Sequence, residues 1–543
     1  MKTFKKFISI KSITTVLFFI YVLYPILGNY LNVGDDTAFH LLRISEIFDN
    51  LKNGYILPTI YANSLDGYGY GNPFFYPDLF LYIPALLMFT GISVAVAYKI
   101  LLIIITIVTM YITYYSVKGI FKSDNVAFLT MIAYTGSMYR IHNIQVRGAL
   151  GEIIAMTFLP LIIYGLYKVV YDGDSDYKER KLIYLPLSLG FTLTLYTHLI
   201  SFFIMVLTAG IYFIKHIRKI YKEKRYIDII KATLVSIGLS SPFLFPMLFM
   251  MSKDVYSYNE TVTFKLTDRL INILEALEIQ INDYLLFFIW IVVVAIIVFL
   301  CKYIFKKYKY SQLKRISVEM LLVGIFMLIL ATDLTPWVVI EKLFPPIGLI
   351  QFPFRFLSLA LFFIILSNCI ILDKLITNIN LKILIVYMVT ILLSINTLSY
   401  YGLKGTNDYI PNTNYIGQGE YLPKGYEYSY YTNKENIITS KDDNLEIISD
   451  NKNLRKREIV FKTNVLDDEL ILPYTYYYGY EVTVNNKKVE VFKTDKALLG
   501  VKLNDITEGT LKVEYKQPFI RYLSLGICGL TILVLMNKKK RLI

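Results

Sequence analysis

Long apolar stretches recur along nearly the whole chain, and they limit its possible folds more than any other feature of the sequence. A chain of 543 residues that is 55% hydrophobic, with a mean hydropathy of +0.50, cannot bury that much apolar surface in one soluble core. A helix needs about 20 apolar residues to cross a bilayer, and several of the stretches reach that length. The sequence therefore predicts a polytopic α-helical membrane protein.

About twelve stretches have the composition of a membrane span, although several are short or interrupted. The expected spans are residues 12–27, 94–116, 127–139, 149–167, 182–197, 199–214, 229–251, 284–300, 318–331, 356–372, 383–398 and 522–536.

Lysine and arginine gather in short clusters between these stretches, as in the cytoplasmic loops of membrane proteins. The clusters lie near residues 5–11, 118–122, 178–181, 215–225, 302–315 and 538–541. All of them fall on one side of the membrane if residues 78–90 form a helix lying in the membrane surface and not a span. We therefore expect a multi-pass protein of the cell membrane with both termini in the cytoplasm. The net charge of +14 then marks topology and does not indicate nucleic-acid binding.

Three regions follow from this arrangement. Residues 1–398 would form the transmembrane domain, with a long outer loop at 28–93, and residues 519–543 would form a last anchor with a basic tail. Residues 399–518 would form an extracytoplasmic β-sandwich-like domain, because apolar and polar residues alternate at 458–462, 481–484, 488–492 and 511–515. The pair Asn485–Asn486 predicts a hairpin turn between two of these strands.

Several familiar chemistries have no signature in the sequence. No phosphate-binding glycine loop, zinc-protease motif or nucleophile elbow occurs. Cys301, Cys369 and Cys528 lie in or beside apolar stretches, so they offer no disulfide framework to the outer domain. Carboxylates such as Asp36 and Glu152 are suitable ligands for a divalent ion, but no spacing of residues requires a metal.

The segment after the first expected span carries the most informative polar pattern. In a helix that begins near Asp36, the side chains of Asp36, His40 and Arg43 share one face, and an apolar stripe lies beside them. Such a helix on the membrane surface would present a carboxylate, an imidazole and a guanidinium together. The alternative is an ordinary helix start, at which Asp35 or Asp36 interacts with the first free N–H groups.

Residues 68–78 are rich in aromatic rings and glycines, which suits a sugar-stacking surface that includes Tyr70 and Tyr76. The alternative is an interfacial aromatic belt.

Further ionisable residues lie at the expected outer ends of spans. Glu152 is a candidate site residue because a charge near hydrocarbon is costly, with His142 and Arg147 close in sequence; the alternative is a structural pair between Arg147 and Glu152. Arg355 is suited to binding a phosphate, or else it extends to lipid headgroups. His198 is more simply a satisfied polar group.

With these features in place, the chain resembles the GT-C membrane glycosyltransferases, and within them the bacterial YfhO-type proteins and the group labelled 6-pyruvoyl-tetrahydropterin-synthase-related membrane proteins. The resemblance depends on residues 34–43, 67–77, 147–160, 351–356 and 472–516. It implies an extracytoplasmic enzyme that moves a sugar from a polyprenyl-phosphate donor in the bilayer to a cell-envelope polymer, such as teichoic acid or a surface polysaccharide, with inversion.

The resemblance also implies roles for the candidate residues. Asp36 would be the catalytic base, and Glu152 a second catalytic carboxylate. The sequence pattern, and not the resemblance, gives the candidate substrate-binding residues, which are Asp35, His40, Arg43, Tyr70, Tyr76, His142, Arg147 and Arg355. Two other classes stay open: a flippase or transporter of lipid-linked sugars, whose polar groups are expected near mid-bilayer, and a non-catalytic envelope assembly protein.

Overall fold

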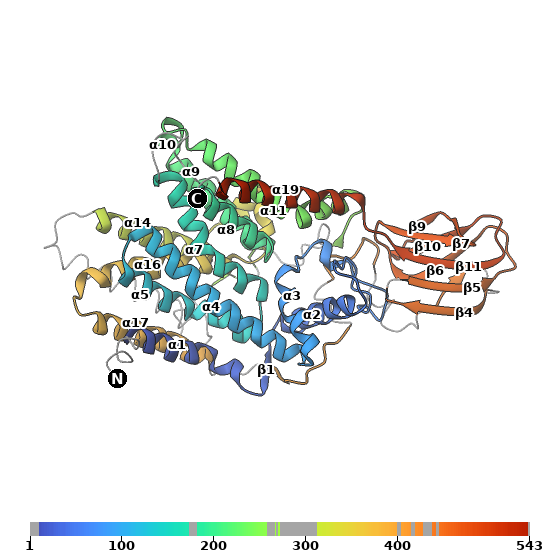
Figure 1. Ribbon diagram of the computed structural model, residues 1–543, viewed down its shortest axis with the longest axis horizontal. Coiled ribbons are helices and arrows are strands. Elements are labelled where there is room, and N and C mark those ends of the chain that lie inside the picture. Colours follow the sequence, from blue (N-terminus) through green and yellow to red (C-terminus); the bar gives the residue numbers. More distant parts are fainter. Residues whose placement is uncertain are drawn as a thin grey trace. The chain divides into compact units, whose positions relative to one another are not determined.

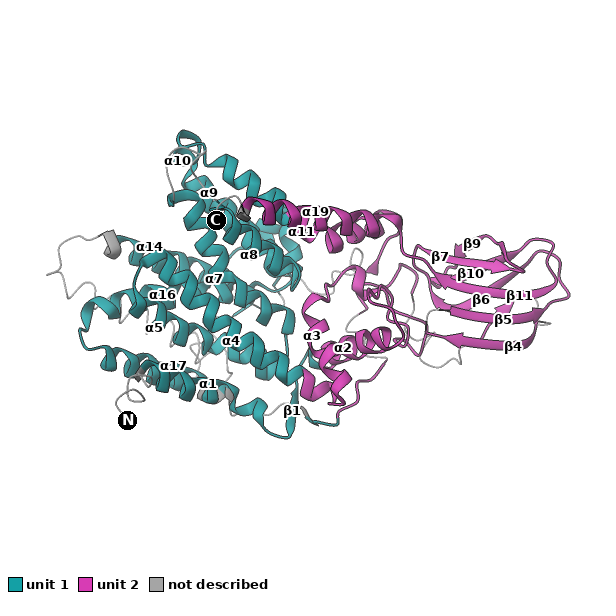
Figure 2. Ribbon diagram, viewed as in Figure 1, with its two compact units in different colours: residues 1–37, 98–236, 263–408 teal, residues 38–97, 237–262, 409–543 magenta. Residues whose placement is uncertain are grey.

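The computed structural model describes residues 10–172, 182–257, 266–267, 270–271, 312–398, 403–413, 419–426, 437–440, 445–454 and 456–540. It is mostly helical, with antiparallel β-sheets near the C-terminal end (Figure 1). The chain divides into two compact units (Figure 2). Unit 1 comprises residues 1–37, 98–236 and 263–408, and unit 2 comprises residues 38–97, 237–262 and 409–543. This division groups most of the first expected outer loop with the C-terminal region.

Unit 1 is mostly helical, with these helices in the part of it that the structure describes. They are α1 (Ile10–Leu27), α4 (Val94–Phe121, mostly in this unit), α5 (Asp124–Thr135), α6 (Met138–His142), the π-helix η5 (Asn143–Arg147), α7 (Leu150–Tyr171), α8 (Leu185–Leu195), α9 (Leu199–Lys215), α10 (Ile217–Lys222), the first part of α11 (Tyr226–Lys253), α14 (Gln312–Leu330), α15 (Trp337–Leu343), the 3-10 helices η7 (Pro345–Ile350) and η8 (Pro353–Phe356), α16 (Leu357–Leu375) and α17 (Ile379–Leu398).

In the part of the chain that the structure describes, five helices are long and apolar enough to cross a membrane. They are Val94–Phe121, Leu150–Tyr171, Tyr226–Lys253, Pro353–Leu375 and Phe519–Lys538. The expected number of about twelve spans is therefore too high, because several expected spans form apolar helices of only 10–17 residues, such as Leu185–Leu195. The expected span at 284–300 lies outside the described residues. A multi-pass membrane protein remains the class that these helices indicate.

Helix α7 lies among α8, α9 and α16, and most of its side chains are buried. The hydroxyl groups of Thr109 on α4 and Thr157 on α7 share a hydrogen bond of 2.7 Å. Helix α5 is only 12 residues long because the chain turns at Gly136 before α6 begins. This interrupted stretch, from α5 through η5, replaces the continuous span expected at 127–139.

A short ribbon joins distant parts of unit 1. Strand β1 (Tyr30–Val33) pairs antiparallel with β2 (Leu403–Thr406), so the chain just before Asp36 is held by the chain that follows α17. The ammonium group of Lys99 donates to the carbonyl oxygen of Gly28 and to Oδ1 of Asn407, both at 2.7 Å. These bonds fix the ribbon at both of its strands.

In unit 2, helix α2 (Thr37–Lys52) begins one residue after Asp36. Its apolar stripe is buried as expected, but its polar residues His40, Arg43 and Glu46 are buried too, at 1–2% exposure. An amphipathic helix with a free polar face is therefore not what forms. Residues 79–90 form the expected short helical segment, with α3 (Tyr82–Leu87) between the 3-10 helices η3 (Leu79–Leu81) and η4 (Met88–Thr90).

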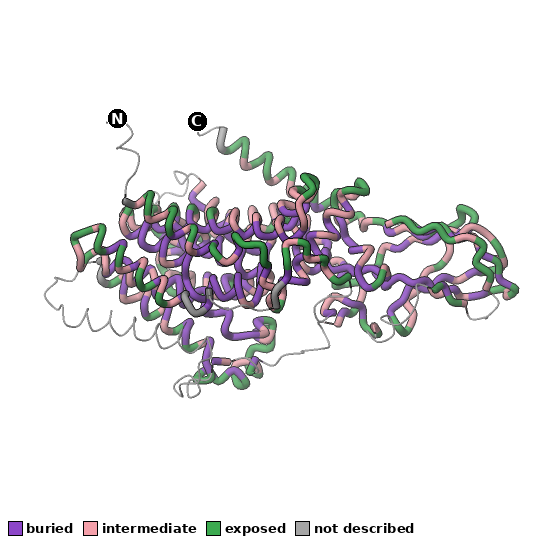
Figure 3. Tube along the Cα trace, turned by 90° about the horizontal axis from the view of Figure 1, so that it is seen from below, coloured by how far each residue is buried: buried purple, intermediate pink, exposed green. Residues whose placement is uncertain are grey.

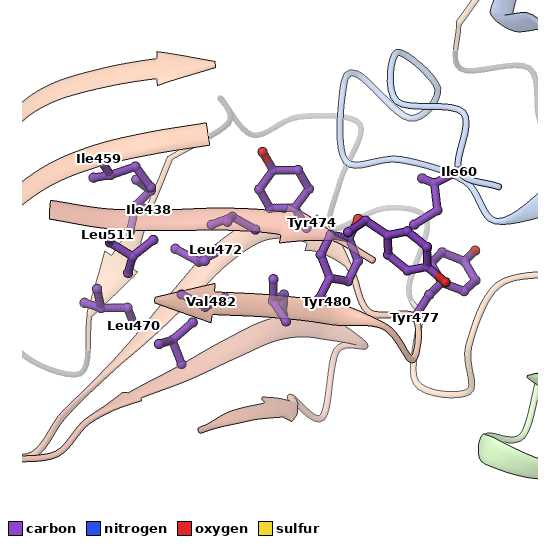
Figure 4. Close-up of a cluster of buried hydrophobic side chains, with 14 of the residues drawn as sticks. Ile60, Ile438, Ile459, Leu470, Leu472, Tyr474, Tyr477, Tyr480, Val482 and Leu511 are labelled. Carbon is purple, nitrogen blue, oxygen red and sulfur yellow. The ribbon is translucent and has the colours of Figure 1, made fainter. Parts of the chain in front are cut away.

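The β-region of unit 2 consists of two antiparallel sheets, ordered β3-β6-β10-β9 and β4-β5-β11-β7-β8. The strands are β3 (Thr439–Ser440), β4 (Glu446–Asn453), β5 (Lys456–Lys462), β6 (Asp468–Thr475), β7 (Tyr480–Val484), β8 (Lys487–Lys488), β9 (Val491–Lys493), β10 (Leu498–Leu503) and β11 (Glu508–Tyr515). Side chains of both sheets form one hydrophobic core, which also includes Ile60 from the first loop (Figure 4).

The predicted hairpin is confirmed. Strands β7 and β8 pair antiparallel, with Val484 opposite Lys487. Asn485 and Asn486 between them have φ values of +48° and +65°, the left-handed geometry that a two-residue turn of this kind requires.

Helix α19 (Phe519–Lys540) follows the sheets and is exposed along most of its length (Figure 3). Its Arg521 donates to the carbonyl oxygen of Pro242 at 2.9 Å, and Ser241 donates to the carbonyl oxygen of Ser524 at 2.8 Å. Few other polar contacts hold this helix, so lipid is the expected neighbour of its apolar side chains.

Candidate functional site

The loop that carries Asp36 is joined to η5 by backbone and side-chain hydrogen bonds, all within unit 1. The N–H group of Asp36 donates to the carbonyl oxygen of Arg147 at 2.8 Å. Just before it, the amide of Asn32 donates to Oε1 of Gln145 at 3.1 Å. The position of Asp36 is therefore set by the segment that also supplies Arg147.

Two glycines permit this close approach. A Cβ atom on Gly34 would lie 2.1 Å from the carbonyl oxygen of Val146, and one on Gly148 would lie 1.9 Å from Oγ1 of Thr37. Gly148 also has a φ of +66°, a conformation that other residues adopt only at a cost. Neither position accommodates a side chain without movement of the backbone that holds Asp36.

Arg147 and Glu152 form a buried ion pair, with 2.9 Å between Nη1 and Oε2. Arg147 also donates to Oδ1 of Asn143 at 2.7 Å, and the other oxygen of Glu152 accepts a hydrogen bond from the hydroxyl group of Tyr139. The structural pair that the sequence left open is thus present. Because both oxygens of Glu152 are engaged, its carboxylate is suited to orienting Arg147.

Arg355 approaches the same oxygen of Glu152 that Arg147 contacts, with its Nε 4.0 Å from Oε2. Its Nη1 donates to the carbonyl oxygen of Ile350 at 2.7 Å and to Oε1 of Gln351 at 3.1 Å. Nε itself is buried and makes no hydrogen bond. This N–H group is a buried donor with capacity for a new acceptor.

Two aromatic rings in the segment before α16 pack against the guanidinium groups of both arginines. The rings of Phe352 and Phe354 stack at 5.3 Å with an angle of 8°. The guanidinium carbon of Arg147 lies 4.7 Å from the Phe354 ring centre, and that of Arg355 lies 4.9 Å from the Phe352 ring centre. Two stacked rings thus support two neighbouring cations, which like charge would otherwise drive apart.

Asp36 is half-buried beside these cations. Burial raises the pKa of the Asp36 carboxyl above its ordinary value, and the charges of Arg147 and Arg355 partly offset that rise. The result is a carboxylate that is more basic than a solvated one. With Asp36 and Glu152 ionised, the formal charges of the four groups sum to zero.

The nearby histidines add no charge at neutral pH. Burial, helped by Arg147, lowers the pKa of His142 to about 4. Burial, helped by Arg355, lowers the pKa of His198 to about 3. His198 caps α9 by accepting a hydrogen bond from the N–H group of Ser201 at 3.3 Å, as a satisfied polar group would.

Of the other predicted site residues of the first loop, His40, Arg43, Tyr70 and Tyr76 lie in unit 2, where the first two and Tyr76 form a cluster. Arg43 pairs with Asp78 at 2.7 Å, contacts Nδ1 of His40 at 3.3 Å, and has its guanidinium carbon 4.0 Å from the ring centre of Tyr76. Tyr61 donates to the second oxygen of Asp78 at 2.7 Å. The charge of Arg43 is paired with Asp78, and the residue is only 2% exposed. Arg43 therefore has the environment of a structural residue.

Tyr70 and Asp35 differ in exposure. Tyr70 is 1% exposed and packs in a hydrophobic cluster with Leu65 and Leu422, so it offers no free ring for a sugar. Asp35 is exposed to solvent.

Several polar residues of these clusters were not predicted as site residues. Tyr139 and Asn143 hold the Glu152–Arg147 pair, and a buried Glu46 in unit 2 accepts a hydrogen bond from the hydroxyl group of Ser64 at 2.8 Å. The sequence signal for Tyr139 and Asn143 was their spacing on the same side of short helical turns as Arg147. Among the described residues, no group of three metal-binding side chains lies close enough to hold an ion.

Comparison with known proteins adds little to this geometry. No family model matches the chain. An uncharacterized protein of Lactococcus lactis subsp. cremoris (strain MG1363) is 24% identical over 256 residues, which cover 45% of this chain and 41% of that protein. The chain thus matches less than half the length of this relative.

Proposed function

We propose that this chain is a membrane glycosyltransferase of the GT-C type, which transfers a sugar from a polyprenyl-phosphate donor to an envelope polymer such as teichoic acid or a surface polysaccharide. The observation that carries the proposal is the arrangement of one basic carboxylate, Asp36, beside two guanidinium groups, those of Arg147 and Arg355. This set of groups suits a displacement at a sugar phosphate.

In the proposed reaction, Asp36 takes the proton from an acceptor hydroxyl group. The hydroxyl oxygen attacks the anomeric carbon in line, and the bond from that carbon to the phosphate oxygen breaks with inversion. The phosphate leaves with the bonding electrons and gains one negative charge, so it needs cationic stabilisation and no general acid. A positioned base of this kind contributes about 10²- to 10⁴-fold to the rate.

The contacts of the arginines support a division of roles. Arg147 is oriented by Glu152 and Asn143, whereas Arg355 retains a buried N–H group without a hydrogen bond. Arg355 therefore offers an N–H group that an incoming phosphate oxygen would satisfy. Glu152 acts in this proposal as a positioning residue for Arg147, and not as a second base.

The basic clusters of the sequence support a topology with both termini in the cytoplasm and residues 399–518 outside. A lipid-linked donor is the form in which activated sugar reaches that side.

Transfer of label by purified protein tests the proposal. Liposomes that contain the protein and radiolabelled polyprenyl-phosphate hexoses are incubated with teichoic acid or surface polysaccharide, and label in the polymer is counted. We expect transfer that depends on the protein. Absence of transfer to every acceptor, together with protein-dependent movement of the labelled lipid between leaflets, would instead identify a flippase.

That second function has one observation in its favour. Arg140 is fully buried and contacts Thr106 and Thr109 near the middle of α4. Ionisable groups at such a depth are common in transporters.

A further inference from the structure

Arg140 is a buried cation whose contacts do not neutralise it. Its side chain is 0% exposed, and it donates to the carbonyl oxygen of Thr135 at 3.3 Å and to Oγ1 of Thr106 and Thr109 at 3.2 and 3.4 Å. All three bonds are longer than the usual distance of about 2.9 Å. Its Nε makes no hydrogen bond, and no carboxylate among residues 10–540 that the structure describes forms an ion pair with it.

The threonine partners supply oxygen atoms but no negative charge. The hydroxyl group of Thr106 donates its proton to the carbonyl oxygen of Leu102 at 2.8 Å. The single proton of the Thr109 hydroxyl group is shared between the carbonyl oxygen of Ile105 and the hydroxyl group of Thr157, each at 2.7 Å. They therefore face Arg140 with lone pairs only. A guanidinium that leaves water for such surroundings is strongly destabilising unless a counter-charge accompanies it.

Two further donors lie in the turn to which Arg140 is bonded. Helix α5 ends at Thr135 and α6 starts at Met138, and the hydroxyl groups of Thr135 and Ser137 in this turn are buried without a hydrogen bond. Two hydroxyl groups and the Nε–H group of Arg140 are thus donors without acceptors in one turn of chain. Such donors are typical ligands of an anion.

We propose that Arg140, Thr135 and Ser137 bind a halide ion, chloride under ordinary conditions, inside unit 1. A monatomic anion matches the site because one guanidinium supplies a single positive charge and the surrounding helices bury it completely. A phosphate group would bring more charge and more oxygen atoms than these donors match. The ion would hold together the interrupted stretch from α5 to α6.

Thermal unfolding of the full-length protein in detergent tests this site. Sodium chloride or sodium bromide replaces sodium gluconate at equal ionic strength, and the midpoint is measured for wild type, Arg140→Met and Arg315→Gln. Arg315 is a matched control because its side chain is 76% exposed. We expect halide to raise the midpoint of wild type and Arg315→Gln by at least about 2 °C, and to leave Arg140→Met unchanged.

A second variant keeps the arginine and removes the hydroxyl donors. In Thr135→Val/Ser137→Ala, the halide concentration for half of the midpoint shift should rise at least about tenfold. In crystals grown with bromide, an anomalous peak should lie within hydrogen-bond distance of the Arg140 guanidinium. The same halide dependence in wild type and both site variants, or bromide crystals without that peak, would overturn the proposal. Either result is independent of sugar transfer.

Discussion

The N–H group of Asp36 donates a hydrogen bond of 2.8 Å to the carbonyl oxygen of Arg147, so the candidate base and the first candidate phosphate ligand share one backbone contact. A shift of either segment would move both groups. This coupling explains why residues 34 and 148 are Gly34 and Gly148, since a Cβ atom at either position would collide with the other segment.

Substitution of Gly34, at the contact between the Asp36 loop and η5, should lower transfer activity more than it lowers the stability of the fold. Gly34→Ala places a methyl group 2.1 Å from the carbonyl oxygen of Val146, so the Asp36 loop must move. We expect at least about tenfold lower transfer activity, since small misplacement of reacting groups is costly. Gly28→Ala is the control, because nothing lies within 4 Å of a Cβ atom there, and its activity and midpoint should match wild type. Equal effects of both changes would contradict the role of the contact.

The two arginines should affect the donor and not the acceptor. Arg355→Ala removes a guanidinium group whose Nε–H makes no hydrogen bond within the protein. The KM for the lipid-linked sugar should therefore rise about tenfold or more. Arg355→Lys should restore only part of this, because lysine lacks the planar fork. Initial rates at varied donor and acceptor concentrations provide the measurement. Unchanged donor kinetics in Arg355→Ala and Arg147→Ala would show that both residues only stabilise the helices.

Stability should depend on pH through Glu46. Burial raises the pKa of Glu46 from 4.5 to about 7, partly offset by hydrogen bonds from Ser64 and Asn63. A carboxyl with a raised pKa stabilises the fold at a pH below its unfolded pKa, and this contribution is lost as the pH rises through the folded value. The loss between pH 4 and pH 8 is about 3 kcal/mol at most.

Glu46→Gln does not titrate, so its midpoint should exceed that of wild type at pH 8 but not at pH 4. Midpoints of thermal unfolding across this range are the measurement. Glu508→Gln, at an exposed position of the same unit, is the control and should follow wild type at every pH. A Glu46→Gln curve parallel to wild type would show that Glu46 does not titrate in this range.

Membrane topology is accessible to cysteine labelling. Asn485 and Lys222 are both exposed. The proposed topology predicts that a cysteine in place of Asn485 reacts with an impermeant maleimide in intact cells, whereas one in place of Lys222 reacts only after lysis. Labelling of the Asn485 position only after lysis would invert the topology and remove Asp36 from an outer active site.

Local patterns predicted local structure well, and they failed where distant parts of the chain meet. The Asn485–Asn486 hairpin was predictable because two left-handed residues between alternating segments require it. The Arg147–Glu152 pair was predictable from proximity in sequence.

The approach of Arg355 to the same carboxylate was not predictable, because it depends on the packing of α7 and η8. The polar face of α2 was misinterpreted for the same reason. Helical periodicity shows that His40 and Arg43 share a side, but only the fold shows that Asp78 and Tyr76 cover that side. The number of spans was too high because apolar composition does not reveal where a helix ends, as Gly136 ends α5.

The most direct test of the account is the transfer rate of Asp36→Asn in the liposome assay, measured beside Asp35→Asn. Asparagine keeps the shape of the side chain and removes the proton acceptor, so the rate should fall by about 10²-fold or more with unchanged expression and unfolding midpoint. Asp35 is exposed, and its variant should retain most of the activity. Transfer by Asp36→Asn above about a tenth of the wild-type rate would contradict the assignment of Asp36 as the base.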